Sequence, residues 1–448
     1  MALAALAQTV APLSIIGEDM QVDHPGQLSW FTAAYSMSLG AFILPAGRIG
    51  DMYGHKNIFL LGWLWFALFS FMAGFGHSWG PIAFSVARGF QGIGPALLVP
   101  NAMALIGRTF PIGTKRNIVF SVFGACGPTG FLVGAAMSSL LSEKTWWPWT
   151  FWTSALVSLF TTAISFFVIP KSMAKAPAPP GTLIPSFDFL GALTGISGLI
   201  FINFSLNQAP LVGWKTPYVY YLLLIGVMLT FAFVYVELQW VRCPLVPIRG
   251  LQPQAVMALA CICAGWASHG IWIYYFFKFL ERLRNESPLL ATLHLVPVAP
   301  MGIAWALSTN FLIKKFHVSK LMLLSMIFFF VGMVLLAFAP QDQSYWLQIF
   351  LSVIIMPGGM NLSFPAGTIL LSNAMPREHQ GKAASLISTV VNYSIASGLG
   401  FAGSVERSIN YDGTRTLEGY RGACYLGMGF SGVGVLISIY FVWRSRKC

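Results

Sequence analysis

The sequence has little charge: only 9% of its 448 residues are Asp, Glu, Lys or Arg, whereas 56% are hydrophobic. A soluble domain carries about 25% charged residues, because charge solvates its surface. A chain so poor in charge cannot cover its surface for water, so we expect lipid to be its solvent. The longest polar connection, at 170–187, has 18 residues, and we expect no soluble module. The net charge of +12 is therefore interpreted as a sign of membrane topology, and nucleic acid is excluded as a partner.

Cysteines are also few, and the six in the chain are scattered. Their spacing matches neither a disulfide framework nor a zinc site. Cys261 and Cys263 form the closest pair, and we expect them to pack in a helix. The sequence contains no nucleophile and base in an arrangement that would indicate an enzyme. We therefore expect no metal, no cofactor and no catalysis.

The chain does contain apolar runs of membrane-spanning length, separated by short polar connections. No basic segment precedes the first run, so we interpret it as a span and not as a signal peptide. The sequence predicts fourteen spans, at roughly 1–17, 28–49, 57–76, 81–107, 117–141, 148–169, 187–207, 217–238, 252–279, 287–312, 319–339, 345–372, 382–404 and 422–443. Because the number is even, both termini are expected on the same side.

The basic residues indicate which side that is. The connections on one side, together with the C-terminus, carry seventeen Lys and Arg; the other side carries eight, and Arg88 alone lies within a span. Cytoplasmic loops are the ones enriched in Lys and Arg. We therefore predict that both termini and the loop at 171–185 are cytoplasmic.

Proline divides the series of spans. The Pro-rich segment at 171–185 follows the sixth span, and Pro removes a backbone donor and stops helices. A second break, at Pro244, follows two more spans. We predict an N-terminal six-helix bundle at 1–170, a linker with two inserted spans at 171–250, and a C-terminal six-helix bundle at 251–448. Paired six-helix halves suit alternating access around a central site, and we expect a monomer.

A glycine-rich motif follows the second span: Gly47-Arg-Ile-Gly-Asp51-Met52-Tyr-Gly54-His-Lys56. It closely resembles the loop signature of the major facilitator superfamily, except that the usual Arg after the Asp is Met52. The glycines let two helix ends approach closely. Asp51 can face a helix N-terminus across the bundle interface, and Lys56 can reach carbonyls or a carboxylate. We expect Gly47, Asp51, Gly54 and Lys56 to hold one end of the pore closed; a plain tight turn is the alternative.

The fourth span contains Arg88-Gly-Phe-Gln91-Gly-Ile-Gly, which resembles a second element of the same superfamily. By helical rise, Arg88 lies about 12 Å below the outer end. A buried Arg is costly and needs partners, and Gln8 and Thr9, at similar depth in the first span, can accept its hydrogen bonds. Two interpretations stay open: Arg88 and Gln91 handle substrate or protons, or Arg88 is structural and is held by carbonyls and Gln91.

The fifth span carries Gly124-Ala-Cys-Gly127-Pro128-Thr-Gly130-Phe-Leu-Val-Gly134. It resembles a degenerate form of an antiporter signature, G-x-x-x-G-P-x-x-G-G. Small residues on one helix face allow close helix contact, and Pro128 can bend the span. The match favours export over import, although tight packing alone also explains it.

Further segments extend the resemblance over essentially the whole chain: Thr9-Val-Ala-Pro-Leu13, Trp147-Pro-Trp149, Phe187-Asp188-Phe-Leu-Gly191 and Gln380-Gly-Lys-Ala-Ala384. Together they resemble the fourteen-span drug:proton antiporter family. They are most similar to its fungal branch linked to aminotriazole resistance, borate efflux and low-affinity ammonium transport, and to efflux pumps of fungal metabolite gene clusters. The resemblance implies an all-α membrane protein with the major facilitator fold, two six-helix bundles plus two extra spans.

One departure from that family concerns proton coupling. Many members of that family carry an Asp in the first span, but here no predicted span core contains Asp or Glu. His269 and His294, in neighbouring spans, remain as titratable candidates, with packed neutral histidines as the alternative. Trp266, Asn361 and Asn392 are candidates for lining a substrate cavity, and packing or an interfacial belt is the competing interpretation. We expect proton coupling to be weak or to run through histidine.

These observations predict a secondary active transporter whose partners are a small-molecule substrate and the lipid bilayer. Efflux of toxic small molecules or fungal secondary metabolites is the leading function. The alternative is a facilitator or importer of a small polar solute such as ammonium or borate, which the missing acidic residue favours. A multi-pass protein of the plasma membrane is expected, with the vacuolar membrane as the alternative.

Overall fold

The computed structural model describes residues 1–22, 24–110, 114–170, 187–241, 244–246, 248–373 and 380–445. All regular secondary structure in these residues is helical. The predicted loop at 171–185 lies outside the described residues. The predicted all-α class is confirmed for the part of the chain that the structure describes.

The N-terminal half contains six helical segments. Their bounds are α1 Ala2–Val10 and α2 Leu13–Asp19, followed by α3 Pro25–Tyr53, α4 His55–Ala73, α5 Gly76–Thr109, α6 Thr114–Lys144 and α7 Pro148–Val168. The first segment is broken in two because Pro12, with φ −93° and ψ 32°, leaves the helical conformation and has no N–H to donate.

Two helices follow, α8 Phe189–Val212 and α9 Pro217–Gln239. The Asp188 carboxylate accepts a hydrogen bond from the Gly191 backbone N–H at 2.7 Å, as an N-cap residue does. A short turn of 3-10 helix, η2 Ile248–Gly250, leads into the C-terminal half.

The C-terminal half again contains six segments. Their bounds are α10 Pro253–Lys278 with the π-helical turn η3 Phe279–Leu283, α11 Pro288–Leu295 with α12 Val298–Lys315, α13 Val318–Ala337, α14 Gln348–Asn373, α15 Gln380–Ile409 and α16 Thr416–Ser445. Each of the predicted apolar runs therefore contains helix. Eleven of the described helical segments are long and apolar enough to cross a membrane; α1 with α2, α3 and α6 are helical but are not among them.

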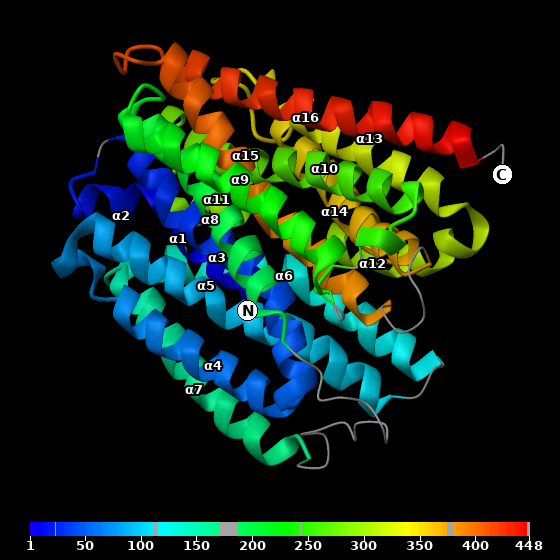
Figure 1. The fold of residues 1–448 in the computed structure, drawn as a ribbon. Helices are drawn as coiled ribbons and strands as arrows, with labels where there is room; N and C mark the ends of the chain where they lie inside the picture. Colours follow the sequence, from blue (N-terminus) through cyan, green and yellow to red (C-terminus); the bar gives the residue numbers. More distant parts are fainter. Residues whose placement is uncertain are drawn as a thin grey trace, which may run out of the picture.

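The two halves pack as separate bundles that meet along two seams. One seam is α3 against α15, and the other is α6 against α11 and α12. Helix α8 packs on both α3 and α15, and α9 packs on α8. In Figure 1 the blue-to-teal helices of the N-terminal half fill the lower part of the view, the yellow-to-red helices the upper part, and the green α8 and α9 cross between them.

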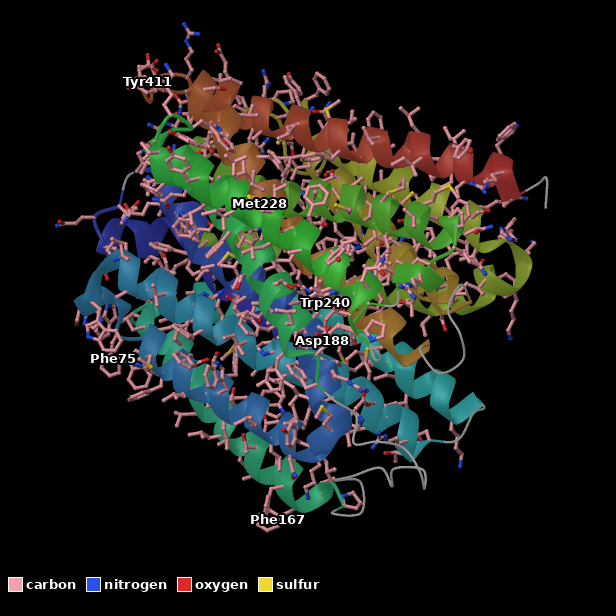
Figure 2. The ribbon with its side chains drawn as sticks, in the orientation of Figure 1. Phe75, Phe167, Asp188, Met228, Trp240 and Tyr411 are labelled. Carbon is pink, nitrogen blue, oxygen red and sulfur yellow. The ribbon has the colours of Figure 1, made fainter. Side chains whose placement is uncertain are left out.

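The outside of the molecule is apolar. Phe167 on α7 and Met228 on α9 are 82% and 70% exposed (Figure 2), which a soluble protein of this size would avoid over so many positions. Lipid is the solvent that such a surface requires. We call the end of the bundle at which α3 meets α4 the inner end. The end at which α4 meets α5 is the outer end, because the basic residues predict that the inner end faces the cytoplasm.

Candidate functional site

A cavity of about 690 Å³ lies between the two halves. Its walls come from α1, α3, α4, α5 and α6 of the N-terminal half and from α10, α12, α14 and α15 of the C-terminal half. It reaches Phe59 in the second turn of α4 and Ile369 near the end of α14. Both positions lie close to the inner end, so the cavity extends towards that end.

The cavity wall is mainly apolar. Its large apolar side chains are Trp63, Leu98, Phe123, Trp266, Met360 and Phe364, and its hydrogen-bonding side chains include Thr309, Asn361, Ser388 and Asn392. None of the lining side chains that the structure describes is charged. A few polar groups on an apolar wall of this size are typical of sites for drug-sized ligands.

Three of the predicted substrate residues, Trp266, Asn361 and Asn392, line this cavity. Each asparagine side-chain amide donates a hydrogen bond to the carbonyl oxygen four residues earlier in its own helix, at 2.9 Å. The Trp266 indole N–H donates to the Ser363 hydroxyl at 3.1 Å. These bonds set the direction of all three side chains before any ligand binds.

The outer end is held closed by contacts between the two halves. The Ser139 hydroxyl on α6 lies 2.9 Å from the Thr292 hydroxyl on α11. One turn further out, the Glu143 carboxylate accepts a hydrogen bond from the backbone N–H of Leu289 at 2.5 Å. Both contacts join α6 to the first turns of α11, so they seal the second seam at its outer end.

A second group of contacts joins α2 to η3. The Ser14 backbone N–H points to the Glu281 carboxylate at 3.4 Å, and the Arg282 guanidinium lies 3.9 Å from the Glu18 carboxylate. We call these four contacts the outer gate; its residues are Ser14, Glu18, Ser139, Glu143, Glu281, Arg282, Leu289 and Thr292. A closed outer gate above a cavity that extends to the inner end is the geometry of an inward-facing state.

The glycine-rich motif forms the junction of α3 and α4 at the inner end. Gly54 has φ 96°, a conformation that side chains other than glycine rarely adopt. A Cβ atom on Gly50 would lie 1.7 Å from the Asn101 side-chain oxygen, so the Asn101 amide occupies the space that a side chain at position 50 would need. Gly47 faces the other half, because its Cβ would lie 3.5 Å from the Ser385 hydroxyl of α15.

The charged residues of the motif contact the N-terminal half. The Asp51 carboxylate lies 3.4 Å from the His55 imidazole, and Asp51 remains 47% exposed. The other imidazole nitrogen of His55 is 2.8 Å from the Asn101 side-chain oxygen. Sequence reasoning missed His55 and Asn101, although His55 lies one helical turn after Asp51. The predicted role of Asp51 in holding the two halves together stays a prediction.

Lys56 is buried and ties α4 to α7. Its ammonium donates hydrogen bonds to the carbonyl oxygens of Phe166, at 2.8 Å, and of Ile169. These carbonyls belong to the last turn of α7, where a helix lacks internal partners and carries partial negative charge. Of the two predicted partners, carbonyls or a carboxylate, Lys56 therefore uses carbonyls.

Arg88 is fully buried within the N-terminal half. Its Nε donates to the Phe31 carbonyl at 3.2 Å, its Nη2 to the Ala5 carbonyl at 2.8 Å and to the Thr9 hydroxyl at 3.2 Å, and its Nη1 to the Gln91 side-chain oxygen. The guanidinium thus joins α5 to α1 and α3. This geometry agrees with the structural interpretation, and a role in substrate or proton handling stays a prediction.

Gln8 does not bind Arg88, contrary to expectation. Its amide nitrogen donates to the Ser154 hydroxyl on α7. Successive helical residues point about 100° apart, so a helix that turns Thr9 towards Arg88 turns Gln8 towards another neighbour. Gln91 in turn donates to the Ser70 hydroxyl at 2.6 Å and extends the buried network to α4.

The antiporter-like motif contributes to both the cavity and the packing. Gly127 and Pro128 line the cavity. A Cβ on Gly134 would lie 2.4 Å from the Ala4 carbonyl oxygen, so α1 and α6 touch there through their backbones. Gly130 differs, because a Cβ at this position would meet no atom within 4 Å.

The two predicted histidines lie in different surroundings. His269 is 7% exposed and its ring packs against Trp266 and Trp272; its Nδ1 has no hydrogen-bond partner. The ring borders a void of about 20 Å³, which is space for one water molecule. The His294 imidazole instead forms an ion pair with the Glu286 carboxylate at 2.9 Å, near the outer end.

Two buried carboxylates lie within the long helices of the C-terminal half. The segments with membrane-spanning length and composition run Pro253–Leu283 and Ala384–Ile409, beyond the predicted apolar runs. They include Glu281 and Glu406, which are 9% and 3% exposed. Both carboxylates lie beyond the predicted apolar runs, because the helices continue past the last apolar residues, and the expectation that no span core carries Asp or Glu stays a prediction.

Glu406 forms a buried ion pair. The Lys278 ammonium lies 2.9 Å from one carboxylate oxygen, and the Tyr275 hydroxyl donates to the other at 2.6 Å. Tyr275 and Lys278 are three residues apart on α10 and share a face. This polar spacing at the end of the predicted apolar run at 252–279 was the available sequence signal. The pair binds α10 to α15, and it gives the Glu406 carboxylate one cation and one hydroxyl donor.

The comparison with protein families matches this architecture. The family model described as Major Facilitator Superfamily matches residues 1–400 and residues 306–447. A crystal structure of a POT family transporter with a thioalcohol-conjugated peptide superposes with a TM-score of 0.72 and 13% identity, covering 100% of this chain and 94% of that one. At this identity the likeness shows the fold alone.

Curated fungal relatives are much more similar. A low affinity ammonium transporter of Saccharomyces cerevisiae is 47% identical over 446 residues, which are 99% of this chain and 86% of that protein. An efflux pump of Aspergillus terreus is 42% identical over 445 residues, with 99% and 86% covered. The aminotriazole resistance protein of Saccharomyces cerevisiae is 34% identical over 445 residues, with 98% and 81% covered. The chain is thus a multi-pass membrane protein that belongs to the Major Facilitator Superfamily, among fungal transporters that include efflux pumps.

Proposed function

We propose that this protein exports neutral, drug-sized, largely apolar molecules by alternating access between its two halves. The observation that carries the proposal is the cavity of about 690 Å³ whose described lining side chains are uncharged. Burying an ion on such a wall would cost several kcal/mol without a partner of opposite charge. A neutral amphipathic compound instead gains from the buried apolar area, about 25 cal/mol per Å², and finds a few polar groups to orient it.

The 42% sequence identity to an efflux pump supports export. The antiporter-like motif supports it as well, since its Gly127 and Pro128 line the cavity. A second candidate function is passage of a small polar solute, which the 47% identity to a low affinity ammonium transporter favours. The lining argues against an ammonium site, because such a small cation would need several closely placed oxygen or aromatic ligands.

We extend the proposal to topology. Fourteen spans in a six, two, six arrangement, with both termini and the loop at 171–185 in the cytoplasm, agree with the distribution of Lys and Arg. The plasma membrane is the proposed location, because export removes toxic compounds from the cell there. A cysteine introduced at position 175 should react with impermeant reagents only in broken cells, and labelling in intact cells would overturn the topology.

Transport by purified protein in liposomes tests the function. Neutral apolar fluorescent compounds and ammonium are offered separately, with and without an imposed pH difference. We expect saturable movement of the neutral compounds, weakened by Asn392→Leu and Trp266→Ala and unchanged by the matched change Trp443→Ala on the exposed outside of α16. Movement of ammonium alone, insensitive to the cavity variants, would replace export by the second candidate.

A further inference from the structure

Two carboxylates of the outer gate accept a backbone hydrogen bond from the opposite half of the protein. Glu143 on α6 accepts the Leu289 N–H at 2.5 Å, and Glu281 in η3 accepts the Ser14 N–H at 3.4 Å. The first bond is short and lies in the first turn of α11, where the helix dipole stabilises a negative charge. The second is at the limit of a hydrogen bond. The gate therefore holds one carboxylate well and the other poorly.

Glu281 is the poorly held one. It is 9% exposed, and its second oxygen, Oε1, has no hydrogen-bond partner. A buried carboxylate needs hydrogen bonds or a paired cation to remain ionised, and one long hydrogen bond does not replace its lost water. Other carboxylates of the C-terminal half have such partners, as Glu406 has in Lys278 and Tyr275.

Two charged groups act on Glu281 in opposite directions. Arg282, next to it in the chain, attracts the carboxylate, but its guanidinium is directed to the exposed Glu18. The Glu143 carboxylate repels it. The Asp19 carboxylate on α2 is directed to another partner, because it accepts a hydrogen bond from the Trp147 indole N–H at 2.7 Å.

On the neighbouring elements, the Lys278 ammonium of α10 is paired with Glu406, and the His294 imidazole of α11 lies 2.9 Å from the Glu286 carboxylate. Among the described residues, no Lys, Arg or His nitrogen lies within ion-pair distance of the Glu281 carboxylate. An ionised Glu281 would therefore lie buried without an ion-pair partner in the described part of the chain.

The backbone at this position is irregular as well. Glu281 is the middle residue of the π-helical turn Phe279–Leu283 that ends α10. Single π-helical turns within α-helices are rare and occur frequently at functional sites. This turn directs Glu281 towards Ser14 of the opposite half, so the irregularity places a titratable group at the seam that must part when the gate opens.

We propose that Glu281 is a proton-binding site of the outer gate: the gate closes when the Glu281 carboxyl group carries a proton and opens when it is ionised. The proton comes from the outer solution while the gate is open, and it is occluded on closure. The proposal rests on the alternating access of the proposed function, but it concerns the conformational equilibrium and not the identity of the substrate. External alkalinity should thus shift the protein towards the outward-open state.

The experiment measures the gate directly, without substrate. Spin labels on Trp146→Cys in the N-terminal half and Tyr411→Cys in the C-terminal half report the distance across the outer end; both positions are exposed, and Tyr411 is visible at the upper left of Figure 2. The native cysteines are replaced by serine. Pulsed electron resonance of the full chain in lipid nanodiscs then gives the open and closed populations from about pH 5 to about pH 9. For one linked proton, the open-to-closed ratio should rise by up to about tenfold per pH unit.

Variants identify the titrating group. Glu281→Gln mimics the protonated carboxyl, so its gate should stay closed and lose the pH response, whereas Glu281→Asp should keep a response at a shifted midpoint. Glu418→Gln, at an exposed acid on α16, should respond as the parent protein does. Burial, with a contribution from Arg407, lowers the pKa of the His24 imidazole below its usual range.

Two results would overturn the proposal. They are a parent protein whose label distance is independent of pH and a Glu281→Gln variant that keeps the response. If export is absent while the gate still responds to pH, the proposed function is rejected, but the assignment of Glu281 as the proton-binding site of the gate stands. If Glu281→Gln does not fold, Glu281→Asp provides the test, because its gate should respond to pH with a shifted midpoint.

Discussion

The Nη2 atom of Arg88 on α5 donates a hydrogen bond to the backbone carbonyl oxygen of Ala5 on α1 at 2.8 Å. A carbonyl inside a helix normally accepts only the N–H four residues later, and the guanidinium uses its second lone pair. The bond joins the first and fourth segments of the N-terminal half close to the Pro12 break. Arg88 thereby holds α1 in position beside the cavity without lining it.

We predict that Arg88→Ala abolishes transport and that Arg88→Lys restores little. Lys keeps the charge but loses the planar fork that holds Phe31, Ala5 and Thr9 at the same time. Each hydrogen bond from a charged donor contributes about 1.5–3 kcal/mol, and a truncated partner is left buried and unpaired. Uptake into vesicles, normalised to folded protein, measures the effect. Arg415→Ala, at an exposed position, is the control, and near-normal flux in the Lys variant would reduce Arg88 to a simple charge.

A second prediction compares two glycines of one helix. Gly134→Ala should destabilise the protein by about 1–3 kcal/mol, because overpacking against the α1 backbone forces the helices apart. Gly130→Ala should be neutral or slightly stabilising, since a Cβ there meets no atom and Ala favours helix by up to about 1 kcal/mol. Thermal unfolding of the two variants in the same detergent measures the difference. Equal melting temperatures would show that α1 and α6 do not pack as described.

The glycine-rich motif supplies a third prediction. Asp51→Asn or Gly54→Leu should strongly reduce transport while leaving membrane insertion intact. At Gly54, φ 96° makes a Leu side chain cost about 1–3 kcal/mol in local strain, and at Asp51 the charge that is expected to meet the opposite half is removed. Transport at matched expression is the measurement, and Met52→Arg, which restores the usual residue of the family motif, should stay active. Full transport by both variants would reject a gating role.

The fourth prediction concerns proton coupling through histidine. Histidine is the side chain whose ordinary pKa, about 6.5, lies nearest neutral pH, so His269 and His294 are the candidates that the sequence offers. The double variant His269→Gln, His294→Gln should still bind substrate and exchange it downhill, but it should lose accumulation against a gradient. Accumulation in vesicles with an imposed pH difference is the measurement.

Two outcomes separate the alternatives for this prediction. If transport by the parent protein does not depend on an imposed pH difference, the facilitator function is favoured. Full accumulation by the double variant would exclude the histidines and direct attention to a carboxylate such as Glu281. Of the two histidines, only His294 contacts a carboxylate, that of Glu286. The two single variants are therefore informative as well, because only His294→Gln removes such a contact.

Hydrophobicity and local motifs predicted most of the helices and the family. Each helix satisfies its backbone internally, so a run of apolar residues bounded by Pro, Gly or charge specifies it without reference to the rest of the chain. The α1–α2 break at Pro12 and the Gly54 junction are equally local. The ends of α10 and α15 were misjudged, because hydropathy alone ends a span where polar residues begin, although Lys278 and Glu406 neutralise each other within longer helices.

By itself, the sequence determined most of the helices and the membership in the superfamily. Only the tertiary structure decided which polar residues share a cavity, that Gln8 binds Ser154 while Thr9 binds Arg88, and that Glu281 is buried against the opposite half. The physical reason is distance along the chain: Gln8 and Ser154 are 146 residues apart, and Ser14 and Glu281 are 267 apart. Helical periodicity places a side chain on a face, but only the packing of several helices shows what that face meets.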